Sequence, residues 1–527
     1  MVDSSRLDRD AALLARLGYK QELRRYFSPL EIFCTAISLL GIVASFAAGF
    51  PFGIPNGGPV AMVWGWTFCS FFLMAIGLTM AECAAIAPTS GGLYYWTYIF
   101  STPKWRCFLS WVVGCMLYAN TITNIASIAS IEWGCAVQIM AAISIGTDLT
   151  FEATNAQTFG LFCAIIISHA IINSLNPRVI ANLQYFFVVI NLLLCAAVII
   201  ALPAATPKNL LNDAKFVFTG FVNLSEWPNG FAFIISFLTP MWSMGCFEGP
   251  VHISEEAINA SVAIPYAIIV ATASGLVLAW GMNLSLAFCM VTDVVSVVES
   301  PIGHPMAAIM YNSFGKKGVL AVWSMIIFVL YAIGVGQLTV CSRQIFAFCR
   351  DGGLPLSRWV YHVHSKLGTP VRAVWFSVLL SIALVTISFA GPNAINAVFS
   401  LVVTGQYTAY TIPFAARFLG GQEIEKGPVS YGKMSLPITV VAIIWMCVMS
   451  VIVMFPANPA PGVSGMNYTV VVQGGVLGLA VLYYFIPKYG GRHWFKGPVV
   501  TISGTDADSD SISDKAPDAV VDSLKEG

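Results

Sequence analysis

The sequence has 527 residues, of which 57% are hydrophobic and only 10% are charged. A water-soluble globular protein carries about 25% charged residues, so this composition excludes an ordinary soluble fold. Basic and acidic side chains balance at 26 each, and the net charge therefore gives no reason to expect nucleic acid as a partner. We predict an all-α integral membrane protein that is surrounded by a lipid bilayer.

A basic N-terminal tail (1–28) without the apolar core of a signal peptide precedes the first of twelve apolar runs. A helix of about 20 apolar residues crosses a bilayer, and the hydrocarbon forces its backbone groups to bond within the helix. The twelve predicted transmembrane helices lie near residues 30–50, 59–87, 107–142, 157–175, 179–203, 230–253, 262–290, 318–347, 371–390, 393–416, 436–455 and 468–487.

These spans fall into two groups of five and a final pair. Residues 29–203 hold spans 1–5, an extracytoplasmic loop (204–229) follows, and residues 230–418 hold spans 6–10. Spans 11 and 12 occupy 436–487. The last segment, 488–527, is predicted to be a cytoplasmic tail that is disordered from about residue 503, because it is acidic and poor in apolar residues.

Lysine and arginine are distributed unevenly over the predicted loops. Twelve spans place both termini on one side of the membrane, and 22 of the 26 basic residues fall on that side, against four on the other. Because basic loops stay in the cytoplasm, we predict that both termini are cytoplasmic. The N-glycosylation motifs at Asn223 and Asn467 fall on loops assigned to the outer side, which agrees with this orientation.

Small residues interrupt the first predicted span. Gly41, Ile42, Val43, Ala44 and Ser45 lie at its middle, where backbone N–H groups that leave the helix are able to point at a ligand. The alternative is a continuous helix whose small residues allow close packing, which is common in membranes. Span 1 alone does not decide between these readings, and we take its five residues as substrate-binding candidates.

The sixth predicted span is interrupted more strongly. Pro240 and Pro250 enclose two glycines and a carboxylate, and a continuous helix there would be strained because proline removes a backbone donor. Freed carbonyls and half-helix ends suit the two charged groups of a zwitterion, and spans 1 and 6 are five apart, as inverted five-helix repeats require. The substrate-binding candidates of this span are Trp242, Ser243, Gly245, Phe247 and Glu248.

The two aromatic residues among these candidates flank the break, where a ring holds an ammonium group by a cation–π attraction of about 0.5–2 kcal/mol. Ordinary packing is the alternative for each ring. Intramembrane carboxylates are rare and costly, so Glu248 is our first candidate for gating or coupling and Glu132 the second. Glu82 and His169 are instead assigned to structural pairing and packing.

Neither a catalytic nor a metal-binding pattern is present in the sequence. The thirteen cysteines show no CxxC or CxxH spacing, and the six histidines form no cluster beyond His362 and His364 on a basic loop. We therefore expect no cofactor, no metal site and no enzymatic activity.

Four motifs resemble the amino acid–polyamine–organocation superfamily, in particular its fungal branch of GABA-permease-like and choline-permease-like proteins. They are GGPVAMVWGW from Gly57, AECAAIAPTSGGLYYW from Ala81, GCFEGPVHISEE from Gly245 and SRQIFAFCRDGGLPLSRW from Ser342. This resemblance covers most of residues 20–500 and implies twelve helices with a LeuT-like core of two inverted five-helix repeats.

The resemblance further implies a substrate site at the unwound centres of spans 1 and 6. Gly41 to Ser45 would receive a carboxylate, and Ser243 to Glu248 an amine, mainly through the backbone. The span 1 stretch lacks the Gly-Ser-Gly pattern of many amino acid carriers, a departure that weakens the case for an α-amino acid carboxylate.

We therefore predict a secondary transporter, coupled to protons, for an amino acid, a GABA-like compound or a related amine. A choline permease, which would need an aromatic cage in place of an anion site, is the main alternative, and a membrane enzyme or a transporter-like sensor are the others. The expected location is the plasma membrane, with the vacuole or another endomembrane as the alternative.

Overall fold

The computed structural model describes residues 4–115, 119–175, 177–354, 356–365, 367–390, 394–422, 424–462, 465–488 and 490–501. In this part of the chain the regular structure is helical, and the β-type pairing consists of isolated bridges such as Phe27 with Ala257. The tail from about residue 503, predicted to be disordered, lies outside the described residues.

Twenty-three α-helices are assigned within these residues. The helices are α1 Ser4–Arg16, α2 Pro29–Leu40, α3 Ile42–Gly53, α4 Gly58–Val60, α5 Trp66–Ile86, α6 Leu93–Phe100, α7 Arg106–Cys115, α8 Ala119–Gly146, α9 Asn155–Asn173, α10 Pro177–Ala196, α11 Leu202–Ala205, α12 Ala214–Thr219, α13 Asn229–Ile235, α14 Leu238–Ser243, α15 Gly249–His252, α16 Ala260–Cys289, α17 Val294–Val298, α18 Pro305–Arg350, α19 Ser357–Val360, α20 Val371–Val385, α21 Ala394–Leu419, α22 Ser435–Ile452 and α23 Thr469–Phe485.

Nine helical segments of the described residues are long and apolar enough to cross a membrane. They are Pro29–Gly53, Gly58–Ile86, Thr123–Gly146, Asn155–Asn173, Gln184–Ala205, Ala260–Cys289, Pro305–Arg350, Val371–Phe389 and Gly432–Ile452. The other three predicted spans coincide with the broken helices α13–α15, with α21 and with the 17-residue α23. The count of twelve spans and the inverted repeat stay predictions.

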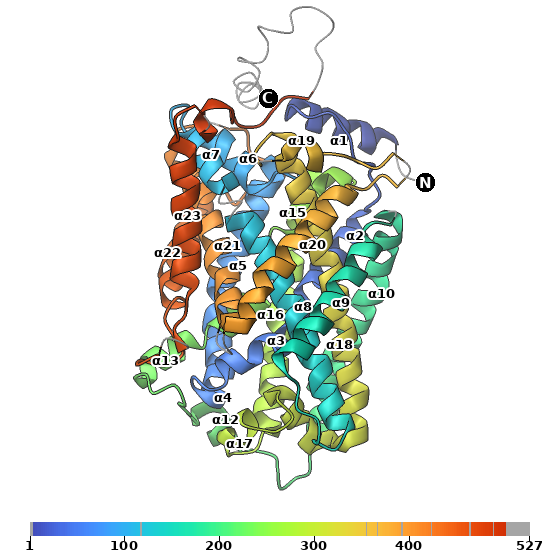
Figure 1. The fold of residues 1–527 in the computed structure, drawn as a ribbon, viewed down its shortest axis with the longest axis vertical. Helices are drawn as coiled ribbons and strands as arrows, with labels where there is room; N and C mark the ends of the chain where they lie inside the picture. Colours follow the sequence, from blue (N-terminus) through green and yellow to red (C-terminus); the bar gives the residue numbers. More distant parts are fainter. Residues whose placement is uncertain are drawn as a thin grey trace, which may run out of the picture.

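The helices form one elongated bundle, in which α8 packs against α18 and α21, and α16 packs against α2 and α5 (Figure 1). Helices α1, α6, α7 and α19 lie at one end of the bundle, which we call the terminal end, and α4, α12, α13 and α17 lie at the opposite end (Figure 1). Helix α18 starts earlier than the predicted span 318–347, but the backbone of Gly315, at φ 67°, separates its first turns from the rest.

Buried ion pairs close the terminal end. Arg350 makes a bidentate pair with Glu255 at 3.0 and 3.1 Å, and Arg343 pairs with Glu256 at 2.7 Å. These pairs tie the C-terminal part of α18 to the segment after α15. Because all four side chains are nearly inaccessible to water, neither partner is stable there without the other.

A segment from the far end of the sequence completes this closure. Asp351 accepts hydrogen bonds from the hydroxyls of Tyr19 and Tyr94 at 2.9 and 2.7 Å and from the backbone N–H of Val499 at 3.1 Å. Burial raises the pKa of Asp351 to about 6, although the neighbouring Arg350 guanidinium opposes this rise. Thr501 also donates its backbone N–H to the carbonyl of Gly18 at 2.9 Å. Residues 497–501 therefore join the N-terminal segment to the end of α18.

We expect Arg350→Met to destabilise the protein by about 3–5 kcal/mol, because it leaves the buried Glu255 carboxylate without its partner. The double variant with Glu255→Gln removes both charges and is expected to recover most of this loss. Thermal unfolding of the detergent-purified protein measures both effects. A single variant as stable as the wild type would contradict the structural role of the pair.

Candidate substrate site

The first break separates α2 from α3 at one residue. Gly41 has φ 46° and ψ 52°, and its N–H donates to the carbonyl of Ile37 at 3.1 Å. A Cβ atom there would lie 1.8 Å from Cδ1 of Ile333 on α18, so the position requires glycine for both conformation and space. The predicted interruption over Gly41–Ser45 is therefore too long, because residues 42–45 already belong to α3.

The second break lies between α14 and α15. Residues 244–248 leave the helix, and Cys246 adopts φ 65°, which is uncommon for a residue with a Cβ. Pro240 lies inside α14 and Pro250 in the first turn of α15. The break, residues 244–248, is therefore shorter than the predicted interruption from Pro240 to Pro250. The carbonyl end of α14 and the amide end of α15 meet here with opposite partial charges.

Helices α3 and α14 run antiparallel beside these breaks. Thr239 donates to the carbonyl of Gly49 at 2.8 Å, and Ser243 donates to the carbonyl of Ser45 at 3.4 Å. The later residue of α14, Ser243, contacts the earlier residue of α3, Ser45, as antiparallel packing requires. Gly49 allows this close approach, since a Cβ there would lie 3.2 Å from the Ser243 hydroxyl.

A small cavity lies between the two breaks and the helices α8 and α21. It is lined by Leu39, Ser45, Ser127, Ile131, Trp242, Ser243, Gly245, Cys246, Val402 and Gln406. Among these described residues there is no charged side chain, and Trp242 is the one aromatic ring. The cavity measures about 10 Å³, which holds about one water molecule. A larger ligand therefore requires the surrounding helices to separate.

Some of the predicted substrate-binding residues line this cavity and others do not. Ser45, Trp242, Ser243 and Gly245 line the cavity. Gly41, Ile42, Val43, Ala44 and Phe247 lie in or beside the breaks, outside the lining. Their substrate-binding roles stay predictions.

Glu248 also lies outside the lining, although it closes the second break. It is 1% exposed, and the hydroxyl of Tyr410 on α21 donates to its Oε2 atom. Its Oε1 atom has no hydrogen-bond partner among the described residues. One face of this buried carboxylate is therefore held by the scaffold, and the other face is available for a proton or for another donor.

The second candidate carboxylate, Glu132, is not among the lining residues of the cavity. Its Oε1 atom lies 2.5 Å from Nδ1 of His169 on α9, and both side chains are fully buried. A Cβ at Gly334 on α18 would lie 2.3 Å from the same oxygen. This glycine allows α18 to close over the pair. His169, which we expected to pack passively, is thus the direct partner of Glu132.

Glu82 makes a structural contact at the terminal end, as expected. It pairs with Arg417 at 2.9 Å and accepts a hydrogen bond from Ser435 at 2.6 Å.

Sequence reasoning missed Gln406, Ser127 and Cys246 in the lining. A buried glutamine within the apolar span of α21 was a usable signal, because polar side chains in a membrane helix usually face the interior of the bundle. Its distance from spans 1 and 6 in the sequence gave no indication that it lies beside them.

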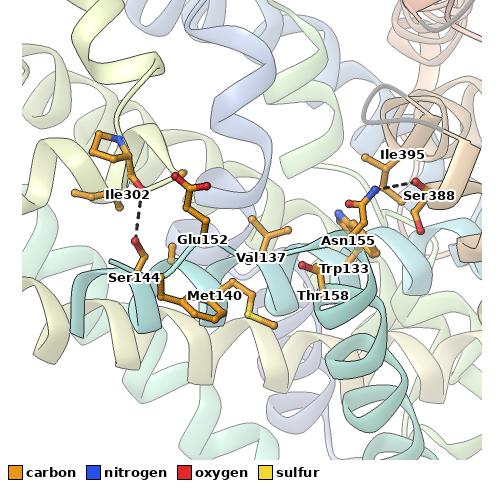
Figure 2. Close-up of a pocket in the computed structure, with 15 residues that line it drawn as sticks. Trp133, Val137, Met140, Ser144, Glu152, Asn155, Thr158, Ile302, Ser388 and Ile395 are labelled. Carbon is orange, nitrogen blue, oxygen red and sulfur yellow. Dashed lines mark hydrogen bonds between the residues drawn. The ribbon is translucent and has the colours of Figure 1, made fainter. Parts of the chain in front are cut away.

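A second, larger cavity of about 430 Å³ opens at the opposite end of the bundle. Figure 2 shows its lining, in which Trp133 and Val137 come from α8 and Glu152 from the loop before α9. Both cavities are lined by α8 and α21, since Ile395 contributes to the larger cavity and Val402 to the central one. At the level between them Trp242 packs on Phe399 with a centroid distance of 4.9 Å.

The two candidate glycosylation residues are held inside the fold by their amide groups. Asn223 donates to the carbonyl of Trp227 and to Asn229, and Asn467 donates to the carbonyl of Val453 at 3.0 Å. A glycan on either amide nitrogen would compete with these bonds. Their modification stays a prediction.

An apolar helical bundle with two neighbouring helix breaks and a cavity between them that several polar side chains enter is typical of membrane transport proteins with discontinuous helices. The family model for amino acid permeases matches residues 27–477. The chain belongs to this family, which consists of permeases and not of enzymes.

Curated relatives resemble the chain over nearly its whole length. It is 35% identical over 512 residues to the GABA-specific permease of Saccharomyces cerevisiae, covering 96% of this chain and 88% of that protein. An uncharacterized amino-acid permease of Schizosaccharomyces pombe is 32% identical over 501 residues, covering 95% and 90%. The amino-acid permease BAT1 homolog of Oryza sativa is 30% identical over 512 residues, covering 94% and 97%.

Proposed function

We propose that this protein is a secondary active transporter that moves an amino acid or a GABA-like compound across a membrane together with a proton. The observation that carries the proposal is the cavity between the breaks of two antiparallel helices, α3 and α14. Half-helix ends of opposite partial charge meet there, and they suit a substrate that carries both an amine and a carboxylate. The relative named as a GABA-specific permease supports the same substrate class.

The lining favours a zwitterion over choline. A quaternary ammonium group needs several aromatic faces because it cannot donate hydrogen bonds. Trp242 is the one ring among the described lining residues, whereas three serine hydroxyls and one amide face the cavity. These hydroxyl and amide groups bind the amine and the carboxylate of an amino acid.

Glu248 is the proposed coupling residue. It is buried, it lies in the second break, and one of its oxygens is unpaired among the described residues. A carboxylate in this position takes up a proton from the outer side and releases it on the inner side as the cavity changes access. Glu132, paired with His169 at 2.5 Å, is the second candidate.

The terminal end of the bundle is proposed to face the cytoplasm, with both termini inside, and the plasma membrane is the proposed location. The excess of lysine and arginine in loops at that end supports this orientation. The larger cavity then faces the external medium, while the ion pairs of Arg343 and Arg350 close the cytoplasmic side. Twelve spans with two inverted five-helix repeats remain the proposed topology.

An uptake assay in cells that lack their own permeases tests the proposal. We expect accumulation of labelled GABA or of another amino acid that is greater at pH 5 than at pH 7 and that stops when a protonophore is added. Excess unlabelled GABA is expected to compete more strongly than choline. If no amino acid or amine of the panel accumulates although the protein reaches the plasma membrane, the proposal is wrong.

A further inference from the structure

One face of α21 follows the broken helix along its length. Phe399 packs on Trp242, Val402 and Gln406 line the cavity, and Tyr410 donates to Glu248. These positions are spaced by three or four residues, so they share one side of the helix. Gln406 thus lies one turn from Tyr410, between the cavity and the candidate coupling carboxylate.

The Gln406 side chain is buried without a complete set of partners. It is 1% exposed, and its Nε2 atom makes no hydrogen bond among the described residues. Its Oε1 atom lies against the backbone of Gly245, where a Cβ would be 3.0 Å away. The Gln406 amide also lies close enough to the Glu248 carboxylate to favour its ionised form, and Oε1 of Glu248 has no hydrogen-bond partner within the described part of the chain. A donor and an acceptor therefore lie side by side without a full hydrogen bond.

We propose that the Gln406 amide recognises the substrate carboxylate and that it alternates between this carboxylate and Glu248. The inference rests on the proposed function, since it assigns a residue to the substrate of that transport. A primary amide carries two N–H donors, and it is the one NH₂ group among the described lining residues. With no cationic side chain in the lining, neutral donors must bind the carboxylate.

The alternation follows from the chemistry of the two oxygens. Ionised Glu248 is only an acceptor and competes with the substrate carboxylate for the Gln406 donors. When a proton from the outer side binds Oε1 of Glu248, this oxygen becomes a donor, and the Gln406 amide turns to the substrate. The order is proton first and substrate second, and the proton leaves to the cytoplasm after the substrate.

Among the described residues, no other charged group is found to act on Glu248 and to replace this control. The titratable groups that act on it are the Tyr410 hydroxyl on α21 and the Cys246 thiol on its own segment. On the side of α2 and α18, a Cβ added at Gly249, the residue after Glu248, would meet the apolar Leu39 and Val340. Among the described residues, Gln406 is thus the neutral donor that links this carboxylate to the cavity.

The test compares GABA with butylamine, which has the same chain length and amine but no carboxylate. Gln406→Met keeps the length of the side chain and removes its donors. We expect the inhibition constant of GABA, measured against uptake of a labelled substrate, to rise about tenfold or more, and that of butylamine to change less than about twofold. The dependence of the GABA constant on pH is expected to disappear.

Gln473→Met is the matched control, because Gln473 is buried against another face of α21, where it donates to Thr408 at 2.9 Å. It should leave both inhibition constants unchanged. A general packing defect at Gln406 would instead weaken GABA and butylamine equally, and that result would overturn the proposal.

If Gln406→Met does not reach the membrane, Gln406→Glu gives a second measurement. Its carboxylate is expected to weaken inhibition by GABA and to strengthen inhibition by 1,4-diaminobutane. If the ratio of the inhibition constants of GABA and 1,4-diaminobutane is the same as in the wild type, the role of Gln406 is refuted. The proposed function still stands in that case, provided that the wild type takes up GABA or an amino acid. Absence of any GABA or amino acid uptake by the wild type would instead overturn both.

Discussion

Glu248→Gln is expected to lower concentrative uptake at least about tenfold while the protein still reaches the membrane. Glutamine keeps an oxygen that accepts the hydrogen bond from Tyr410, so the local fold is retained. The amide cannot take up or release a proton, and accumulation against a gradient is therefore lost. Exchange of labelled for unlabelled substrate across the membrane needs no net proton movement and is expected to persist.

Uptake and exchange measured at pH 5 and pH 7 check this result, with Glu299→Gln, at an exposed position of the opposite end, as the control. Normal uptake with a normal pH dependence would remove Glu248 from the mechanism. The same assay on Glu132→Gln separates the two candidates. If pH dependence is lost there and kept in Glu248→Gln, coupling belongs to the pair of Glu132 and His169.

Gly41→Ala is expected to destabilise the protein by about 2–5 kcal/mol and to abolish uptake. The left-handed backbone at φ 46° costs an alanine about 1–2 kcal/mol, and a Cβ that overlaps Cδ1 of Ile333 adds an overpacking cost of about 1–3 kcal/mol. Thermal unfolding of the purified protein and uptake by intact cells measure the two effects.

A second substitution separates these two costs. Ile333→Ala removes the overlapping atom, so the double variant, compared with the Ile333→Ala single variant, is expected to show only the backbone part. Gly160→Ala in α9, where a Cβ meets no atom within 4 Å, is the control and should not destabilise the protein. Equal stability of Gly41→Ala and the wild type would show that the first break has no need of glycine.

The positions of the two breaks were predictable because each depends on local chemistry. Glycine permits the left-handed conformation at residue 41, and the prolines at 240 and 250 lie in the short helices on either side of the second break. The lengths of the breaks were not predictable. The second break turns at Cys246, a residue type that gives no conformational signal, and residues 42–45 remain helical since packing against α14 and α18 outweighs their small size.

Partners that are distant in sequence were beyond the reach of sequence patterns. Glu132 was recognised as a costly buried carboxylate, but only the packing of α8 on α9 identifies His169 as its partner. Gln406 lies more than 150 residues from Cys246, and its place beside the cavity depends on the path of α21. The family resemblance, which rested on four motifs, is confirmed by the match over residues 27–477.

The contact of residues 497–501 with Gly18 and Asp351 has a consequence for biosynthesis. These residues leave the ribosome after the spans that precede them in the sequence, so the hydrogen bonds of Val499 and Thr501 form only after those spans have been made. A nascent chain that already has all its helices in the bilayer still lacks this tie between its N-terminal segment and α18. Translation products that stall before these residues are therefore expected to have an N-terminal segment that proteases cut more readily than in the full chain.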